Sequence, residues 1–204
     1  MKTALNAFVL ALAAALAFAA PVAAAKPAQT QSVVLAGGCF WGMQAVFGAL
    51  RGVTAVAGYS GGDEATAHYE MVSTGTTGHA ESVELTYDPA KISFAQILEV
   101  YFLVAHDPTE LDRQGPDDGT QYRSEIFYTT PQQLAASRAY IAKLTSEKIF
   151  NAPIVTQLAP LRGFYPAEAY HQNFVAHNPD NPYVVYNDLP KLQKLKEKFP
   201  QLLR

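Results

Sequence analysis

The sequence predicts an α+β fold in which helices pack on a mixed or antiparallel sheet. Predicted strands and helices alternate in the order β-α-β-β-α-β-α-β, which contains a split βαβ pattern. Hydrophobic residues make up 49% of the 204-residue chain, enough for one domain with a sizeable core. Charged residues make up only 16% and the net charge is −3, which disfavours both a disordered chain and a nucleic-acid-binding surface.

The first predicted elements are a strand, a helix and a second strand. The apolar run SVVLA over residues 32–36 has the length of a strand. A helix is predicted over 42–50, where apolar residues recur on one face. These residues are Met43, Val46, Phe47 and Leu50. The sequence VTAVAGY, residues 53–59, is typical of the second strand.

A long loop is predicted to separate this strand from the next one. Residues 58–81 are rich in Gly, Ser and Thr, and a loop of this length in a compact domain is usually functional. Alternating apolar residues predict a strand over 82–87. Ser93 and Gln96 have the spacing of a capping box, which predicts a helix that continues to about residue 105.

A second polar loop, residues 106–123, precedes the remaining elements. SEIFYT predicts a strand, and the Thr130-Pro131 pair that follows predicts the start of a long helix ending near Lys148. Further along the chain, PIVTQL predicts a strand, and shorter helices are predicted over 166–176 and 189–199.

The first 25 residues have the pattern of a signal peptide. Lys2 provides a positive start, residues 8–20 are apolar and rich in Ala, and small residues precede an expected cleavage site after Ala25. We therefore expect an exported protein, periplasmic or secreted, with a mature domain spanning 26–204 and no membrane attachment after cleavage. An uncleaved membrane anchor is the alternative, although the apolar run is short for a span.

Cys39 is the only cysteine of the chain, and it lies in AGGCFWG between a glycine turn and a predicted helix start. In an exported protein a single cysteine indicates a reactive thiol, an intermolecular bond or a lipid. A polar stretch separates Cys39 from the apolar run, which disfavours lipidation. Free N–H groups at a helix start favour an anion and predict a lowered thiol pKa. A buried structural cysteine is the alternative.

Further candidate catalytic side chains, which could act as acids or hydrogen-bond donors, lie in or beside the two long loops. A carboxyl such as Glu81, placed in an aromatic pocket, has a raised pKa and can serve as an acid, although an exposed strand-end Glu is the simpler reading. The phenols of Tyr69 and Tyr122 can donate hydrogen bonds to an oxygen that gains negative charge, or can be ordinary half-buried tyrosines. Asp117, in GPDDG, is most simply a turn residue.

The five histidines share no spacing typical of a metal site. Glu168-x-x-His171 is a pair on a short predicted helix, but it lacks further partners, so we predict no metal and no other cofactor. A Cys-His hydrolase with His79 or His106 as the base remains open.

Five motifs, in order along residues 32–180, carry a resemblance to a known family. They are GGCFWG, TGHAE, HDPT, GTQYRS and AEAYHQNF. The chain resembles the peptide methionine sulfoxide reductases of the A type, which act on the S epimer of methionine sulfoxide. The resemblance implies an oxidoreductase for free or protein-bound methionine sulfoxide, and a two-layer α/β sandwich with a ferredoxin-like core.

The resemblance also implies roles for individual residues. Cys39 matches the nucleophile, and Glu81 matches the acid that protonates the sulfoxide oxygen. The other matches are Phe40 and Trp41 as aromatic walls around the substrate methyl group, Tyr69 and Tyr122 as donors to the oxygen, and Asp117 as an acid that orders the site. Pro116 stands where the family often has Asn.

Many family members carry further cysteines near the C-terminus, and this chain has none after HQNF. A sulfenic acid on Cys39 must then be reduced by an external thiol such as thioredoxin, glutaredoxin or glutathione. We expect a monomer without a nucleic-acid partner. A non-catalytic module that binds oxidised methionine peptides, with an inert Cys39, is the alternative from another functional class.

Overall fold

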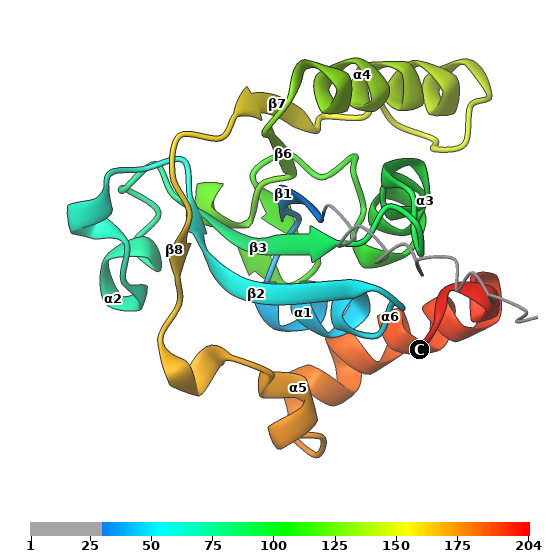
Figure 1. Cartoon of the computed structure of the whole chain (residues 1–204). Helices are drawn as coiled ribbons and strands as arrows, with labels where there is room; N and C mark the ends of the chain where they lie inside the picture. The colour runs from blue at the N-terminus through cyan, green and yellow to red at the C-terminus, as the bar shows by residue number, and fades with distance from the viewer. Residues whose placement is uncertain (1–29) are drawn as a thin grey trace, which may run out of the picture.

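The computed structural model describes residues 30–204, which fold around a six-stranded mixed sheet (Figure 1). The strand order is β7-β6-β1-β3-β2-β8, and every neighbouring pair is antiparallel except β6 and β7. The strands are β1 (Gln31–Ala36), β2 (Val53–Ser60), β3 (Ala80–Tyr87), β6 (Glu125–Tyr128), β7 (Gln157–Pro160) and β8 (Tyr165–Pro166). The predicted α+β class with a mixed sheet is confirmed.

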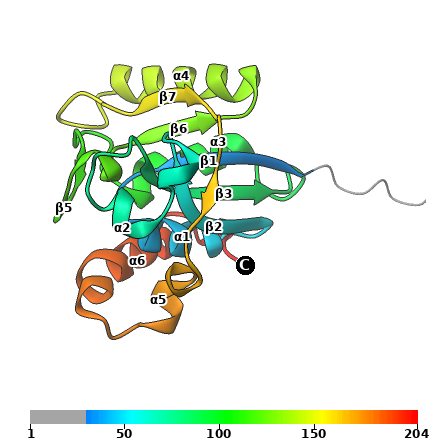
Figure 2. The ribbon, with the colours of Figure 1, turned by 90° about the vertical axis from the view of Figure 1, so that its left-hand side faces the viewer.

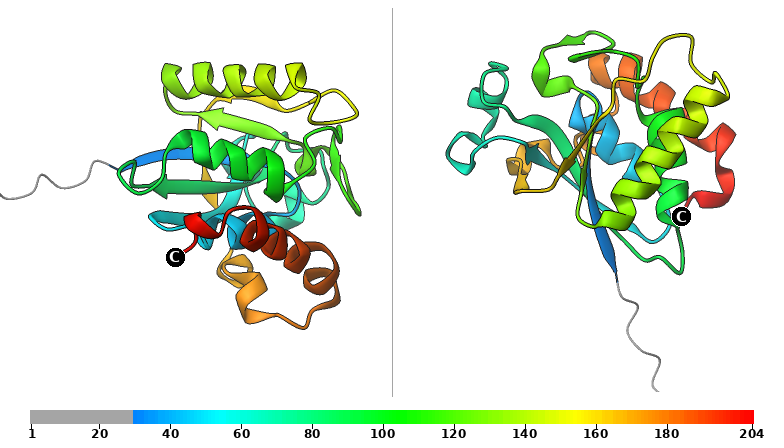
Figure 3. Two further views of the ribbon diagram at one scale, coloured as in Figure 1. Left: turned by 90° about the vertical axis from the view of Figure 1, so that its right-hand side faces the viewer. Right: turned by 90° about the horizontal axis from the view of Figure 1, so that it is seen from above.

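Helices cover one face of this sheet. The main ones are α1 (Phe40–Gly48), α3 (Phe94–Val100) with a π-helical continuation (Tyr101–Ala105), α4 (Pro131–Ser146) and α6 (Leu189–Lys198). Figure 3 shows α4, α3 and α6 following one another along this side of the molecule. The predicted capping box of α3 is present, because the Ser93 and Gln96 side chains each accept from the other's backbone N–H. No helix within residues 30–204 is both long and apolar enough to cross a membrane.

Alternate residues of β1 belong to two different hydrophobic clusters. Val33 and Leu35 lie in the large cluster on the helix-covered face. Val34 lies in a smaller cluster with Phe127, against which Phe164 packs. The chain between β7 and β8 crosses this second face, as Figure 2 shows. The central strand is therefore buried on both sides, which fixes its register.

The helix predicted over 166–176 is wrong. The segment instead contains the end of β8, a 3₁₀ turn (Ala169–His171) and the short helix α5 (Phe174–His177). The side-chain amide of Gln172 bonds both the N–H and the carbonyl of Ala57 on β2, at 3.1 and 2.9 Å. Asn173 has a left-handed φ of 54°. These sheet-edge bonds outweigh the helical preference of the segment.

The long loops contain short elements that the sequence does not predict. A 3₁₀ turn (Glu64–Thr66) and α2 (Tyr69–Val72) lie between β2 and β3. The second loop contains the two-stranded ribbon of β4 (Arg113–Gln114) and β5 (Asp117–Asp118), followed by a 3₁₀ turn (Thr120–Tyr122). The predicted signal peptide, residues 1–25, lies outside the described residues.

Candidate active site

One small cavity collects the side chains that the sequence singles out. Its volume is about 170 Å³, and it lies where the β1–α1 junction meets β3 and the two long loops. Its lining residues are Cys39, Phe40, Trp41, Tyr69, Glu81, Asp117, Tyr122 and Tyr183. The sequence predicts all of them except Tyr183.

Cys39 follows β1 and occupies the N-cap position of α1. Gly38 before it has a φ of 87°, and a Cβ there would lie 2.5 Å from the Gln114 side chain. A Cβ on Gly37 would lie 2.9 Å from the His106 ring. The two glycines therefore allow a tight turn beneath neighbouring side chains, which places the thiol at the helix start.

The Cys39 thiol is buried, with only 8% of the residue exposed. Burial raises the pKa of Cys39 well above its ordinary value, and the charge of the Glu81 carboxylate raises it further. A hydrogen bond from the Trp41 backbone N–H acts in the opposite direction. The prediction of a lowered thiol pKa is therefore wrong for this arrangement, because desolvation outweighs the N–H groups at the helix start.

Glu81 lies in β3 and is only 3% exposed, so it is not the exposed strand-end residue of the simpler reading. Its Oε2 accepts a hydrogen bond of 3.0 Å from the Phe40 backbone N–H. Burial raises the pKa of Glu81 to about 8, although hydrogen bonds from Phe40 and the Cys39 thiol lower it in part. The carboxyl is therefore mostly protonated at pH 7 and can donate a proton.

Tyr69 and Tyr122 reach the cavity from the two long loops. The Tyr69 backbone N–H, at the start of α2, donates a hydrogen bond of 2.9 Å to Glu168 Oε1. The Tyr122 carbonyl accepts one of 3.1 Å from the Gly38 N–H, which ties the second loop to the glycine turn. Burial raises the pKa of both phenols above the ordinary value, so both hydroxyls keep their protons and can donate.

Asp117 accepts a hydrogen bond from the Tyr183 hydroxyl. Asp117 lies in β5, and Tyr183 directly precedes the π-helical turn Val184–Asp188, so the bond joins two segments that are far apart in sequence. Burial raises the pKa of Asp117, while the Tyr183 bond and the Lys191 charge lower it. Sequence reasoning misses Tyr183 because nothing in its local sequence distinguishes it among eleven tyrosines.

Phe40 and Trp41 form the apolar part of the cavity. Phe40 is fully buried, with its ring centroid 5.7 Å from that of Tyr59. Trp41 stacks on Phe174 with centroids 3.6 Å apart and planes at 8°, and its Nε1 donates a hydrogen bond of 3.0 Å to His171 Nδ1. The indole is thus fixed both at its face and at its N–H.

Similarity to known proteins identifies the family of this chain. A family model described as peptide methionine sulfoxide reductase matches residues 31–203. Peptide methionine sulfoxide reductase MsrA 2 of Mesorhizobium japonicum is 55% identical over 174 residues, which cover 85% of this chain and 89% of the relative. The chain belongs to the peptide methionine sulfoxide reductase family.

Solved structures share the fold of this reductase-family chain. Mxr1 from Saccharomyces cerevisiae in reduced form has a TM-score of 0.70 at 31% identity, covering 76% of this chain and 89% of the yeast chain. Mxr1 in complex with Trx2 has a TM-score of 0.50 at 20% identity, covering 75% and 90% of the respective chains, and shows likeness of fold alone.

Neither histidine considered as a hydrolase base lines the reductase-family cavity. The ring nitrogens of His79 lie 3.2 and 3.0 Å from two backbone groups of the first loop. Those of His106 lie 2.9 Å from the Tyr101 carbonyl and 2.7 Å from the Ser124 hydroxyl, and burial lowers the pKa of His106 to about 3. Both rings hold loops in place, and no Cys-His pair is formed.

Within residues 30–204, no group of three or more His, Cys, Asp or Glu could hold a metal ion.

Proposed function

We propose that this protein is a peptide-methionine (S)-S-oxide reductase that repairs oxidised methionine, free or in proteins. One observation carries the proposal: the thiol of Cys39 shares a cavity with Glu81, a carboxyl that holds its proton at pH 7. A sulfoxide oxygen is a poor leaving group until it is protonated, so reduction needs an acid beside the nucleophile. Family membership supports the same activity.

The proposed step begins with attack of Cys39 Sγ on the sulfoxide sulfur. Glu81 gives its proton to the oxygen, and the thiol proton of Cys39 replaces it. Tyr69 and Tyr122 stabilise the oxygen through hydrogen bonds. The protonated oxygen then passes from the methionine sulfur to Sγ. The Sγ–oxygen bond forms while the oxygen–methionine sulfur bond and the transient bond between Sγ and the methionine sulfur both break, which leaves methionine and a sulfenic acid on Cys39. The methionine sulfur gains two electrons, and the cysteine sulfur loses two.

In this proposal, the remaining residues that line the cavity bind the substrate and keep the site in its geometry. Phe40 and Trp41 accept the apolar methyl group of the substrate and exclude water. Asp117 holds the Tyr183 hydroxyl at the polar end of the cavity. The arrangement has room for a side-chain terminus and not for a large ligand, since the cavity volume is about 170 Å³.

The sulfenic acid returns to a thiol with the help of an external reductant. Cys39 is the only cysteine of the sequence, so it cannot form an internal disulfide. Two external thiols supply the two electrons, leaving water and their own disulfide. Thioredoxin, glutaredoxin and glutathione are the candidate donors. For the yeast relative Mxr1, a complex with Trx2 has been solved.

A single-turnover assay tests the activity. The protein is mixed with a peptide containing one epimer of methionine sulfoxide, without reductant. The S epimer should give about one methionine per chain, one added oxygen on Cys39, and a product that reacts with a sulfenic-acid trap. Dithiol should restore repeated turnover. The R epimer and the Cys39→Ser variant should give no methionine.

Binding of the peptide without production of methionine would instead support a non-catalytic binding module. Two methionines per chain without thiol would rule out the recycling scheme.

We also propose that residues 1–25 are a signal peptide and that residues 26–204 form an exported, monomeric catalytic domain. The Lys2 start and the Ala-rich run support this proposal. Mass spectrometry of the protein from its host should show an N-terminus near Lys26. An intact Met1 in a soluble cytosolic protein would overturn it.

The element order supports a ferredoxin-like split βαβ core, which we propose for the unit β1-α1-β2-β3-α3-β6. Its four strands lie in the order β6-β1-β3-β2, and each neighbouring pair is antiparallel. In this arrangement the catalytic thiol follows the first strand, and the acid lies on the third.

A further inference from the structure

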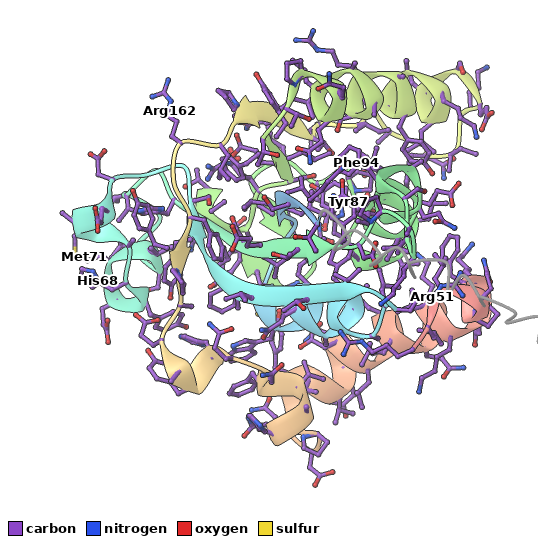
Figure 4. The ribbon with its side chains drawn as sticks, in the orientation of Figure 1. Arg51, His68, Met71, Tyr87, Phe94 and Arg162 are labelled. Atoms are coloured by element: carbon purple, nitrogen blue, oxygen red, sulfur yellow. The ribbon has the colours of Figure 1, made fainter. Side chains whose placement is uncertain are left out.

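The described part of the chain holds two methionines in opposite surroundings. Met43 on α1 is fully buried in the large hydrophobic cluster. Met71 on α2 is 40% exposed and belongs to neither hydrophobic cluster of residues 30–204. Figure 4 shows Met71 at the outer edge of the molecule, near His68. Only the Met71 thioether is therefore open to solvent in the folded protein.

Exposure of a thioether decides whether a peroxide can oxidise it. The peroxide transfers one oxygen atom to the sulfur and leaves as water, so that the sulfur loses two electrons and becomes a sulfoxide. At Met71 the added polar oxygen can project into solvent, whereas at Met43 it would have to enter the core. The folded protein should therefore be oxidised at Met71 and protected at Met43.

We propose that Met71 is an oxidation site of this protein and that a second copy of the chain repairs it, taking the S epimer of Met71 sulfoxide as its substrate. The proposal rests on the proposed function, because it names one protein substrate of the Cys39 cavity.

The geometry of α2 requires the second copy. Tyr69 lines the cavity, and its backbone N–H is held by Glu168 Oε1 at 2.9 Å, which fixes how α2 faces the site. Residues two positions apart on a helix do not share a face, so Met71 points away from the cavity that Tyr69 lines. The Cys39 thiol of a molecule therefore cannot reach Met71 of the same molecule.

The local structure around Met71 makes the side chain available to another molecule. The helix α2 has only four residues, of which Val72 alone is buried. The N–H groups of Met71 and Val72 both donate to the His68 carbonyl, each at 3.0 Å. Such short exposed segments open locally at low cost, so the sulfoxide can be drawn into a small cavity.

The repair step follows the chemistry of the proposed function. The oxygen of Met71 sulfoxide passes to Cys39 of the second copy, the methionine sulfur gains two electrons, and the cysteine sulfur becomes a sulfenic acid. Two external thiols then reduce this sulfenic acid, leaving water and their own disulfide.

Peroxide treatment of the full-length Cys39→Ser variant tests the oxidation site, because this variant has neither a thiol nor reductase activity. Peptide mapping by mass spectrometry should show that Met71 gains one oxygen well before Met43 in the folded protein. After unfolding, both methionines should react at similar rates. Equal rates in the folded protein would overturn the proposal.

Met71→Leu, combined with Cys39→Ser, is the control for the assignment of the added oxygen. The change removes the thioether at an exposed position, so the fold should be kept and the peptide should gain no oxygen. A gain that persists would belong to a neighbour such as His68 or Tyr69, and the proposal would fail.

The oxidised Cys39→Ser protein then serves as the substrate for repair. It is labelled with a heavy isotope, so that its Met71 peptide can be distinguished from that of the unlabelled wild-type enzyme added with dithiol. About half of the labelled Met71 sulfoxide should return to methionine, because peroxide forms both epimers and the enzyme reduces one. With unlabelled Cys39→Ser in place of the enzyme, none should return. Loss of sulfoxide in that control would overturn repair by the cavity.

Concentration separates repair by a second copy from repair within one molecule. Wild-type protein oxidised at Met71 is given dithiol at a series of protein concentrations. The fraction repaired per minute should rise with protein concentration, and a constant fraction would overturn the requirement for a second copy. If the wild-type protein reduces a sulfoxide peptide but leaves Met71 sulfoxide unchanged, this proposal fails and the proposed function stands. If it reduces neither substrate, the proposed function fails as well.

Discussion

The cavity has two sides that the fold builds in different ways. The core side consists of Cys39, Phe40 and Glu81, which come from the β1–α1 junction and β3 and are each less than 10% exposed. The loop side consists of residues from the short helix α2, the two-residue strand β5, a 3₁₀ turn and the start of the π-helical turn, namely Tyr69, Asp117, Tyr122 and Tyr183. The groups that exchange protons and oxygen in the proposed reaction thus lie on the β1–α1 junction and on β3, and the two phenols that would bond to the sulfoxide oxygen lie on the loop side.

The two sides differ in how the fold fixes them. A long strand pairing fixes Glu81 on the core side, whereas individual hydrogen bonds connect the loop side to the rest of the fold. Glu81 is opposite Tyr59 in the eight-residue pairing of β2 and β3, and its carboxyl also accepts from Phe40. Individual hydrogen bonds join loop-side residues to segments far away in the sequence, such as that from the Gly38 N–H to the Tyr122 carbonyl and that from the Tyr183 hydroxyl to Asp117. We therefore expect core-side substitutions to change chemistry without moving the site, and loop-side substitutions to move the site.

The largest effect should come from Glu81→Gln on the core side. The variant should fold and bind the sulfoxide peptide, because the amide oxygen can still accept from Phe40. Its single-turnover rate should fall about 10²–10⁴-fold, since the acid is lost. Glu84→Gln, on the same strand but outside the cavity, is the control and should keep the wild-type rate. A rate within about threefold of wild type would remove Glu81 from the role of acid.

A smaller effect is expected for Tyr183→Phe on the loop side. It removes the hydrogen bond to Asp117, and bonds to charged groups contribute about 1.5–3 kcal/mol when buried. Asp117 is only partly buried, so we expect about a tenfold loss in kcat/KM. Tyr186→Phe, at a position that is 79% exposed, should have no effect. A loss as large as that of Glu81→Gln would mean that the two sides do not differ as proposed.

The positions of Cys39 and Glu81 at the edges of regular elements could be predicted from sequence because their signals are local, whereas the burial of Glu81 could not. The glycine pair before Cys39 and the alternation after Glu81 place both residues beside regular elements. The pKa of the thiol could not be predicted in the same way, since it depends on how deeply α1 and β3 bury the sulfur. A local sequence pattern indicates where a helix begins. The desolvation that raises the thiol pKa arises only when the core has assembled around Cys39.

The positions of the loop-side residues depend on contacts between segments that are far apart in the sequence. Local sequence patterns do not predict such contacts. Tyr183 reaches Asp117 across 66 positions of the sequence. The segment after β8 does not form the predicted helix, because Gln172 bonds to the edge of β2. The same segment supplies His171 and Phe174 to the far side of Trp41. Its role can be seen only once the chain has folded back onto α1.

Gly42 of α1 packs against Asp188, which ends the π-helical turn that follows Tyr183. A Cβ on Gly42 would overlap the Asp188 carboxylate, which is fully buried. Gly42→Ala should therefore lower the free energy of unfolding by about 1–3 kcal/mol, as overpacking does. Gly48→Ala in the same helix is the control, because no atom lies within 4 Å of the added methyl group, and it should be neutral or stabilising. Chemical denaturation measures both, and equal effects would exclude the Asp188 contact as the cause.

The smallest expected effect concerns the thiol itself and separates burial from charge. Above about pH 8 Glu81 is ionised, and its charge opposes ionisation of Cys39. Glu81→Gln removes that charge and leaves burial unchanged, so the thiol pKa should fall toward its ordinary value without reaching it. Alkylation of this single cysteine, followed as a function of pH, should then begin at lower pH in the variant than in the wild type. Asp117→Asn on the loop side should shift the profile in the same direction by less, because Asp117 is the weaker of the two influences. The alkylation profile of the unfolded protein serves as the reference for a Cys39 thiol that is not buried. If the wild-type and Glu81→Gln profiles coincide, the charge of Glu81 does not influence the Cys39 thiol.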